Sequence, residues 1–305
     1  MESTGSTLDA LRRRVRGIEP LRKALTPTWY RYRFGELGRL MNESDRIPNW
    51  SQWRERVSLY HLAAGLPPDP VILEIGCFLG ASTVLMAGAR HGLGSGIVHA
   101  VDPFDGSGDE FSAPVYAGIA HGGDQTLRGR FESAMRHAGV ADRVVVHQAT
   151  AEQLAKSWTE PVDLLYLDGD QSVEGARRAF DLFLPYLKVG GVIVLHNTEE
   201  REYAPDHDGN YRLRVGQLVP PRFAAVFTLD GTTFAHRVAC RRLLPGAALA
   251  VQSARPATTG PENLPLGSAP PLGSAPALGH QATGTEPWYG ASPNANTPPS
   301  AAMTQ

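Results

Sequence analysis

The chain has 305 residues, of which 42% are hydrophobic and 20% are charged. These proportions are those of a globular protein and exclude a collagen-like, coiled-coil or wholly disordered chain. The 29 basic and 31 acidic side chains give a formal net charge of -2, which does not indicate a nucleic-acid-binding protein. The two cysteines, Cys77 and Cys240, are far apart and indicate neither a disulfide scaffold nor a zinc ribbon. Without an apolar run of about 18 residues or a signal-peptide pattern, we expect a cytoplasmic protein that does not bind membranes.

The first 50 residues are basic, with ten Lys or Arg against six Asp or Glu. Within them, Thr7 to Arg16 predicts a short basic helix with apolar side chains on one face. We expect residues 1–50 to form an extension that packs on the main domain or covers its cleft. A membrane-surface or partner-docking role is the alternative. A second helix is predicted from Ser51 to Ala64, with Gly65 ending it.

Short β-rich runs alternate with helical patterns between Val71 and Ala239. Because the strand-like runs are apolar at successive positions, they indicate a parallel sheet that is covered on both faces, within a domain of residues 51–250. The helices between the strands are predicted to begin near Gly80, Gln125, Ala151 and Val173. The predicted strands are Val71–Ile75, Ile97–Val101, Val144–His147, Leu164–Leu167 and Val192–Leu195.

The end of this domain has its own pattern. The helix from Val173 is predicted to end at Gly190-Gly191 and to lead directly into the last of these strands. Two further runs, Phe223–Leu229 and Thr232–Ala239, flank Asp230-Gly231, which is a strong hairpin signal. Beyond them, residues 251–305 are rich in Pro, Gly, Ala and Ser, and we expect a disordered tail.

A glycine-rich turn follows the first predicted strand. Gly76 permits a tight turn and Gly80 permits close helix packing, so a nucleotide-like ligand could approach the backbone there. Phe78 replaces the middle glycine that a dinucleotide pyrophosphate needs, which argues against a nicotinamide enzyme. The second strand ends at Asp102, whose carboxylate could accept both hydroxyls of a ribose, and Phe104 could face a purine.

Polar residues also follow the fourth and fifth strands, whose carboxyl ends should lie at the same edge of the sheet. They are Asp168 and Asp170 after one strand, and His196 and Asn197 after the other. Oxygen ligands beside an imidazole could hold a divalent cation or orient a hydroxyl nucleophile. Helix capping is the structural alternative for Asp170.

Taken together, these motifs resemble a known family, the class I S-adenosylmethionine-dependent methyltransferases. The resemblance covers roughly Val71 to Ala239 and is closest to the small-molecule and sugar O-methyltransferases related to catechol, macrocin and cephalosporin-pathway enzymes. It implies an α/β fold: a doubly wound, Rossmann-like seven-stranded sheet with a C-terminal antiparallel hairpin. The motifs are Glu74-x-Gly76-x-x-x-Gly80-x-Ser82, Asp102, Leu167-Asp168-Gly169-Asp170, Gly190-Gly191 and the hairpin.

The resemblance also implies a cofactor, S-adenosylmethionine, and residues to hold it. Glu74, Gly76, Gly80 and Ser82 would surround its methionine moiety, Asp102 would bind its ribose, and Thr150 would lie near its adenine. The acceptor would be a small molecule or a sugar, and homo-oligomerisation stays open.

Two positions depart from the family pattern. The histidine regarded as the general base is Gln171 here, and glutamine cannot take a proton near neutral pH. The acidic pair or His-Asp that would hold a metal reads His196-Asn197 here, which lacks one carboxylate. The implied Mg²⁺ or other divalent cation would have Asp168, His196 and Asn197 as ligands. The catalytic candidates are therefore Asp168, Asp170 and His196.

We predict an O-methyltransferase. The alternatives are a catalytically inactive cofactor-binding module and, less favoured, a dinucleotide-dependent oxidoreductase.

Overall fold

The computed structural model describes residues 19–122, 125–199 and 206–239, with side chains from residue 32 onward. All of them belong to the first of two compact units, residues 1–241, and the second unit comprises residues 242–305. The basic helix expected from Thr7 to Arg16 and the predicted tail lie outside the described residues.

The described strands form one seven-stranded sheet in the order β3-β2-β1-β4-β5-β7-β6. Strands β1 to β5 are parallel, and β7 runs antiparallel to both of its neighbours. The predicted α/β fold with a C-terminal antiparallel hairpin is confirmed. The strands are β1 (Val71–Ile75), β2 (Ile97–Asp102), β3 (Val144–Gln148), β4 (Val162–Leu167), β5 (Leu187–Leu195), β6 (Phe223–Leu229) and β7 (Thr232–Arg237).

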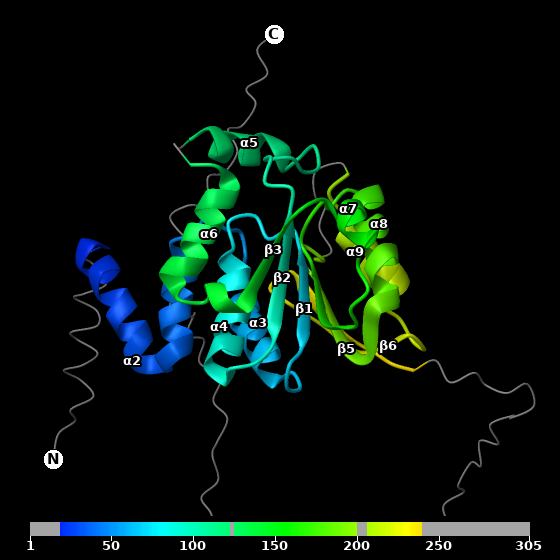
Figure 1. Cartoon of the computed structure of the whole chain (residues 1–305), viewed down its shortest axis with the longest axis horizontal. Coiled ribbons are helices and arrows are strands. Elements are labelled where there is room, and N and C mark those ends of the chain that lie inside the picture. The colour runs from blue at the N-terminus through cyan, green and yellow to red at the C-terminus, as the bar shows by residue number, and fades with distance from the viewer. Residues whose placement is uncertain (1–18, 123–124, 200–205, 240–305) are drawn as a thin grey trace, which may run out of the picture. The chain divides into compact units, whose positions relative to one another are not determined.

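Helices cover both faces of the sheet, as Figure 1 shows. One face carries α3 (Trp53–Gly65), α4 (Ala81–Leu93) and α6 (Leu127–Ala138); the other carries α7 (Ala151–Ala155), α8 (Val173–Phe183) and α9 (Gly209–Gln217). Helix α2 (Glu19–Asp45) packs against α4, and α5 (Ala113–His121) lies beyond the carboxyl ends of the strands. None of the helices in the described ranges is both long and apolar enough to cross a bilayer.

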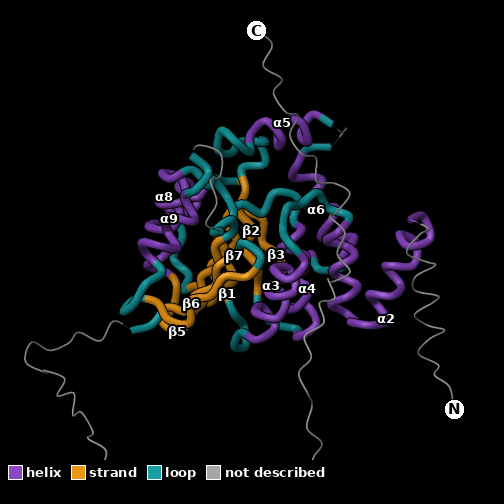
Figure 2. Tube along the Cα trace, turned by 180° about the vertical axis from the view of Figure 1, so that it is seen from behind, coloured by secondary structure: helices purple, strands orange, loops and turns teal. Residues whose placement is uncertain are grey.

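Both faces of the parallel strands are buried, which explains their near-continuous apolar runs. Because successive side chains point to opposite faces, Ile72 packs toward α3 and α4, and Leu73 packs toward α8. Figure 2 shows the strands from behind, enclosed between these helices. The sheet therefore holds its carboxyl edge in a fixed position between two layers.

The helix after Val173 is shorter than predicted. It ends at Phe183, and Pro185 lies in a 3₁₀ turn that leads into β5 at Leu187. Proline has no backbone N–H and cannot continue the helical hydrogen bonding. Gly190 and Gly191 lie inside β5 instead of ending the helix, so that prediction was wrong. The pairing of β5 with β4 shifts register in this region, and Gly190 has φ +85°.

The predicted hairpin is confirmed by β6 and β7, which pair across Asp230 and Gly231. These two residues have φ of 49° and 85°. Positive φ at both central positions is the requirement of a type I′ turn, which explains the Asp-Gly sequence.

The end of α2 belongs to the hydrophobic core. Leu40 and Met41 are buried, and Leu40 packs so closely on Gly88 that a Cβ there would lie 2.4 Å from Leu40 Cδ1. The helix changes direction at Gly35, which has φ 56°. Part of the predicted extension thus contributes to the core, while the predicted boundaries at residues 50 and 250 stay predictions.

We predict that Leu40→Ala lowers the free energy of unfolding by about 2–5 kcal/mol, because it leaves a cavity against Gly88. Tyr32→Ala is the matched control, since Tyr32 is 87% exposed on the same helix and should have little effect. Urea denaturation measures both. Equal effects of the two variants would show that α2 does not pack as described.

Candidate active site

The turn after β1 depends on two glycines. Gly76 has φ +87°, and a Cβ there would lie 2.4 Å from the Gly169 Cα in the turn after β4. Gly80 has φ +93°, and a Cβ there would lie 2.4 Å from Met135 Cε. A side chain at either position would be strained and would clash. The predicted tight turn and close packing are both present.

Asp102, at the end of β2, is bound to this turn. Its Oδ2 accepts a hydrogen bond from the Phe78 N–H at 2.9 Å, and its Oδ1 accepts one from the Phe104 N–H at 2.8 Å. Burial raises the pKa of Asp102, and these two N–H groups oppose that rise. A carboxylate has about four lone-pair sites, so both oxygens can accept further hydrogen bonds from a ligand.

A cavity lies between the turns that follow β1, β2, β3 and β4. Gly76, Asp102 and Thr150 from the predicted cofactor set line it. Asp168 and Asp170 line it as well. Thr150 also begins α7, where its hydroxyl accepts a hydrogen bond from the Gln153 N–H at 3.3 Å. The cavity therefore joins residues that are far apart in the sequence.

The other predicted cofactor residues, Glu74, Gly80 and Ser82, are not among the residues lining this cavity. Glu74 is fully buried, and its carboxyl group accepts hydrogen bonds from the hydroxyls of Ser82 and Thr83. Burial raises the pKa of Glu74 to about 7, against the effect of the two hydroxyls. A role of these residues at the methionine moiety stays a prediction.

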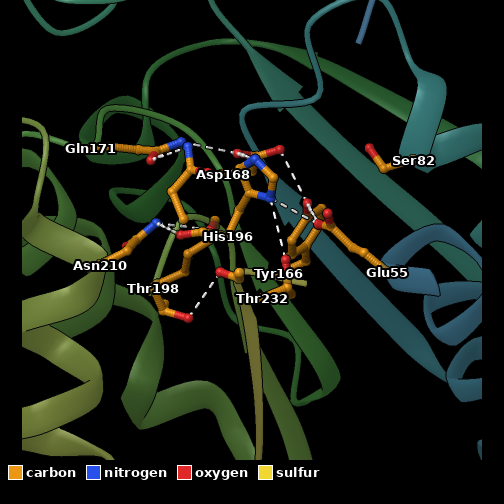
Figure 3. A network of polar contacts seen from close by, with 12 residues as sticks. Glu55, Ser82, Tyr166, Asp168, Gln171, His196, Thr198, Asn210 and Thr232 are labelled. Carbon is orange, nitrogen blue, oxygen red and sulfur yellow. Dashed lines mark hydrogen bonds and ion pairs between the residues drawn. The ribbon is translucent and has the colours of Figure 1, made fainter. Parts of the chain in front are cut away.

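Four polar side chains meet where β4 and β5 end, as Figure 3 shows. Glu55 Oε1 lies 2.8 Å from His196 Nδ1 and accepts a hydrogen bond from the Tyr166 hydroxyl at 3.0 Å. The same hydroxyl lies 3.1 Å from Asp168 Oδ2. His196 Nε2 is 4.0 Å from Asp168 Oδ1. The cluster thus holds two carboxyl groups on either side of one imidazole.

Burial and pairing shift the pKa values of this cluster. Burial raises the pKa of Asp168 to about 6, although the nearby His196 opposes the rise. Burial alone would lower the pKa of His196, but the carboxylates of Asp168 and Glu55 outweigh it and raise that pKa to about 9. For Glu55, burial acts to raise the pKa, yet the imidazole lowers it below its ordinary value. At neutral pH the three groups are therefore a cation between two anions.

Two amides extend the cluster. Gln171 Nε2 donates to Asp168 Oδ1 at 3.1 Å, and Asn197 Nδ2 donates to Gln171 Oε1 at 3.0 Å. Gln171, at the position of the family's histidine, thus orients Asp168 by a hydrogen bond. Asp170 is directed elsewhere, because its Oδ1 accepts from the Ser172 N–H at 2.9 Å and its carboxyl group packs against Gly175.

A second cavity opens beside His196 and Asn197. Its other lining residues come from the segment before α3 and from the end of the sheet. The indole of Trp50 contacts the rings of Phe78 and Tyr116, which line the first cavity, with centroid distances of 6.0 and 5.5 Å. A second link is the 4.0 Å separation between Asp168 Oδ1, which lines the first cavity, and His196 Nε2, which lines the second. The remaining lining residues are Gln52, Glu199, Asp230 and Gly231.

The predicted metal ligands do not fit a divalent cation. The imidazole of His196 can offer only Nε2, because its Nδ1 is bound to Glu55. Asn197 directs its nitrogen toward Gln171, and Gln171 donates to Asp168 Oδ1, so neither amide presents an oxygen to Asp168. Among the described residues, no group of three or more His, Cys, Asp or Glu side chains could hold a metal ion.

Residues 73–198 match a family model described as a methyltransferase domain. The chain contains a methyltransferase domain. Together with the sheet order and the antiparallel hairpin, the match bears out the prediction of a class I S-adenosylmethionine-dependent methyltransferase and favours it over the dinucleotide-dependent oxidoreductase.

Several solved structures are similar to the methyltransferase. An O-methyltransferase from Bacillus cereus in complex with SAH is 18% identical, with a TM-score of 0.49, and the match covers 70% of this chain and 97% of that one. The cofactor-bound protein Rv0187 from MTB is 21% identical, with a TM-score of 0.48 and coverage of 69% and 94%. A SAM-dependent O-methyltransferase from Thermotoga maritima is 16% identical, with a TM-score of 0.44 and coverage of 68% and 72%.

The first cavity of the methyltransferase fits S-adenosylmethionine. Asp102 offers carboxylate lone pairs for the ribose hydroxyls, and Gly76 lines the cavity with backbone alone. Thr150 and Ala149 lie on the wall formed after β3. The residues that are present therefore suit a nucleoside with an attached chain.

Glu55 is the site residue that the sequence analysis missed. In the sequence of helix α3, Trp53, Val57 and Tyr60 form the most evident apolar face. The structure shows that these side chains are only partly buried. The fully buried face contains Glu55, Leu59 and Ala63 at a spacing of four residues. A glutamate in line with apolar residues at helical spacing was the available signal.

We predict that Asp102→Ala lowers the affinity for S-adenosylhomocysteine by at least about tenfold, because it removes charge-assisted hydrogen bonds to the ribose. Calorimetric titration measures this affinity. Asp105→Ala is the matched control, since Asp105 accepts from the Ser107 N–H and does not line the cavity. Unchanged binding by Asp102→Ala would place the cofactor elsewhere.

Proposed function

We propose that this methyltransferase transfers a methyl group to a hydroxyl oxygen of a small molecule or a sugar. The observation that supports this proposal best is the position of Asp168 and His196. Asp168 lines the first cavity, His196 lines the second, and the two side chains are 4.0 Å apart at their nearest charged atoms. An acceptor in the second cavity would thus reach a proton acceptor beside the cofactor cavity.

S-adenosylmethionine supplies a methyl group activated by a sulfonium. The protein must orient the acceptor oxygen and take its proton, because an alcohol ionises only far above neutral pH. Asp168 takes this proton in our proposal. Its side chain is 20% exposed, so a substrate can reach it, and its raised pKa makes it a better base than an ordinary aspartate.

The gap between His196 Nε2 and Asp168 Oδ1 suits a hydroxyl. At 4.0 Å it is too long for a direct hydrogen bond, yet one oxygen can lie within about 3 Å of both atoms. Such an oxygen would accept from Nε2–H and donate to Oδ1. As the proton moves to Asp168, the imidazolium stabilises the negative charge that develops on the oxygen.

Of the predicted catalytic candidates, His196 is the other group that could act as a base. With its ordinary pKa, His196 would have been a base whose activity rises through about 6.5. Because its pKa is about 9, the imidazole already carries a proton at neutral pH and cannot accept another. Asp168, with a pKa of about 6, is mostly ionised there.

We predict that Asp168→Asn lowers turnover by at least about 100-fold, since general-base catalysis typically contributes that much, and leaves cofactor affinity nearly unchanged. Asp163→Asn is the matched control, because Asp163 is a buried carboxylate at the other end of β4, paired with Lys188 at 2.8 Å. A screen of hydroxylated acceptors with radiolabelled cofactor supplies the assay. Full activity of Asp168→Asn would show that the base lies elsewhere. Tight cofactor binding without turnover of any acceptor would favour the inactive module.

The pH dependence of turnover follows from the two pKa values. Asp168 must be deprotonated to accept a proton, so the rate should rise as pH increases through about 6. His196 must be protonated to stabilise the oxygen, so the rate should fall as pH increases through about 9. We therefore predict a bell-shaped pH profile of kcat/KM, which reports the pKa values of the free enzyme. A single rise through about 6.5 would instead indicate that His196 is the base.

A further inference from the structure

We propose that Glu55, contributed by α3, is a positioning residue for methyl transfer that acts through His196 and Tyr166. The proposal rests on the proposed function, because it concerns the side chains that accept the acceptor's proton. Glu55 lies outside the stretch that matches the methyltransferase family model, which begins at residue 73. Its contacts with His196 and Tyr166 are visible only in the folded structure.

Both oxygens of Glu55 have fixed partners. Oε2 accepts a hydrogen bond from the backbone N–H of Gln52 at 3.2 Å, which completes the capping box of α3. Oε1 faces the site, where it contacts His196 Nδ1 and the Tyr166 hydroxyl. The carboxyl group is fully buried. It therefore has no freedom to turn away from the two side chains.

The contact with Nδ1 fixes the imidazole. A carboxylate at 2.8 Å keeps a proton on Nδ1, so the orientation of the ring directs Nε2 toward Asp168. A carboxylate that orients a histidine in this way is a common arrangement in enzymes, and loss of such a partner misplaces the ring or its proton. Thr232 Oγ1, at 3.4 Å from Nδ1, is the nearest substitute and is less favourably placed.

The contact between Glu55 and the Tyr166 hydroxyl connects Glu55 to Asp168, the proposed proton acceptor. The Tyr166 hydroxyl has one hydrogen but lies within hydrogen-bonding distance of Asp168 Oδ2 and Glu55 Oε1. Before transfer it can donate to the Asp168 carboxylate. After Asp168 Oδ1 has taken the acceptor's proton, the carboxyl group is neutral, and the hydroxyl can turn to donate to Glu55 Oε1 instead. One proton moves from the acceptor to Asp168, no electron is transferred, and the Tyr166 hydrogen follows the carboxylate that stays ionised.

A purely structural role does not account for this carboxylate. Capping α3 requires only Oε2, and an uncharged Gln would serve there too. The position continues the buried face of Leu59 and Ala63, where an apolar side chain would avoid the cost of burying a charge. The second oxygen is directed at the two side chains that flank the proposed base.

The test uses the full chain and compares Glu55→Ala with Glu55→Gln. We expect Glu55→Ala to lower kcat by about 10- to 100-fold, as is typical for loss of an orienting partner, with the acceptor KM nearly unchanged. Glu55→Gln should recover part of the lost activity, because its amide oxygen can still accept from His196 Nδ1. Tyr166→Phe should lower kcat without changing cofactor affinity.

A spectroscopic signal separates orientation from stability. In protein labelled with ¹⁵N-histidine, the Nδ1 resonance of His196 is identified by its loss in His196→Asn. This resonance should shift in Glu55→Ala and shift less in Glu55→Gln. A stability effect alone would leave it in place.

Arg56→Met is the matched control. Arg56 is the next residue of α3, is buried, and binds Ser44 and Asp45 at 3.1 and 2.6 Å, away from the cluster. This variant should lower the melting temperature while kcat stays unchanged. Equal losses of kcat in Arg56→Met and Glu55→Ala would overturn the proposal, because they would reflect the anchoring of α3 alone.

The outcomes also separate this proposal from the proposed function. If Asp168→Asn abolishes turnover but Glu55→Ala keeps full kcat and an unshifted His196 resonance, only the role of Glu55 is wrong. If Asp168→Asn keeps full activity, the proposed base is wrong, whatever Glu55 does. A resonance that shifts in Glu55→Ala without any loss of kcat would show that the oriented imidazole is not needed, and would overturn the proposal too.

Discussion

The burial of charge at the carboxyl edge of the sheet is the constraint on which the site depends. Glu55 is completely buried and His196 is 8% exposed, and ionised groups in such places are costly unless they are paired. The 2.8 Å contact between them offsets that cost. Because Glu55 belongs to α3 and His196 follows β5, docking of the helix and assembly of the charged cluster are one event.

The parallel register of the sheet places the remaining members. Tyr166 pairs with Val194 and Leu167 with Leu195, so the residues that follow, Asp168 and His196, emerge side by side. Alternation along β4 puts Tyr166 and Asp168 on the face that α3 covers. The His196 N–H donates to the Leu167 carbonyl and holds the two strand ends together. The distance between base and imidazole is thus set by backbone pairing.

Sequence analysis predicted what depends on local chemistry. Gly76 needs a positive φ, and the glycine itself is the signal in the sequence. In the same way, Asp102 can be recognised as a carboxylate at the end of an apolar strand. It could not predict the role of Glu55, which depends on a contact between residues 141 positions apart. The extent of α8 was mispredicted because Gly190-Gly191 resembles a helix stop and Pro185 was given no weight against it.

The two cavities also differ in whether local sequence or distant contacts form them. The first is built from turns that directly follow strands, where each sequence motif is also a structural unit. The second combines Trp50 and Gln52 with Asp230 and Gly231, segments that only the complete sheet brings together. In the proposed function, acceptor recognition is therefore the part of this methyltransferase least visible in its sequence.

Charge balance bears on one departure from the family pattern, the amide at position 197. At neutral pH, Glu55 and Asp168 contribute two negative charges and His196 contributes one positive charge. A further carboxylate at position 197 would leave the buried cluster strongly negative unless a cation joined it. Asn197 donates a hydrogen bond to Gln171, which donates to Asp168, and neither amide adds a charge. In the proposed function, the imidazolium of His196 then provides, from within the chain, the positive charge beside the acceptor oxygen.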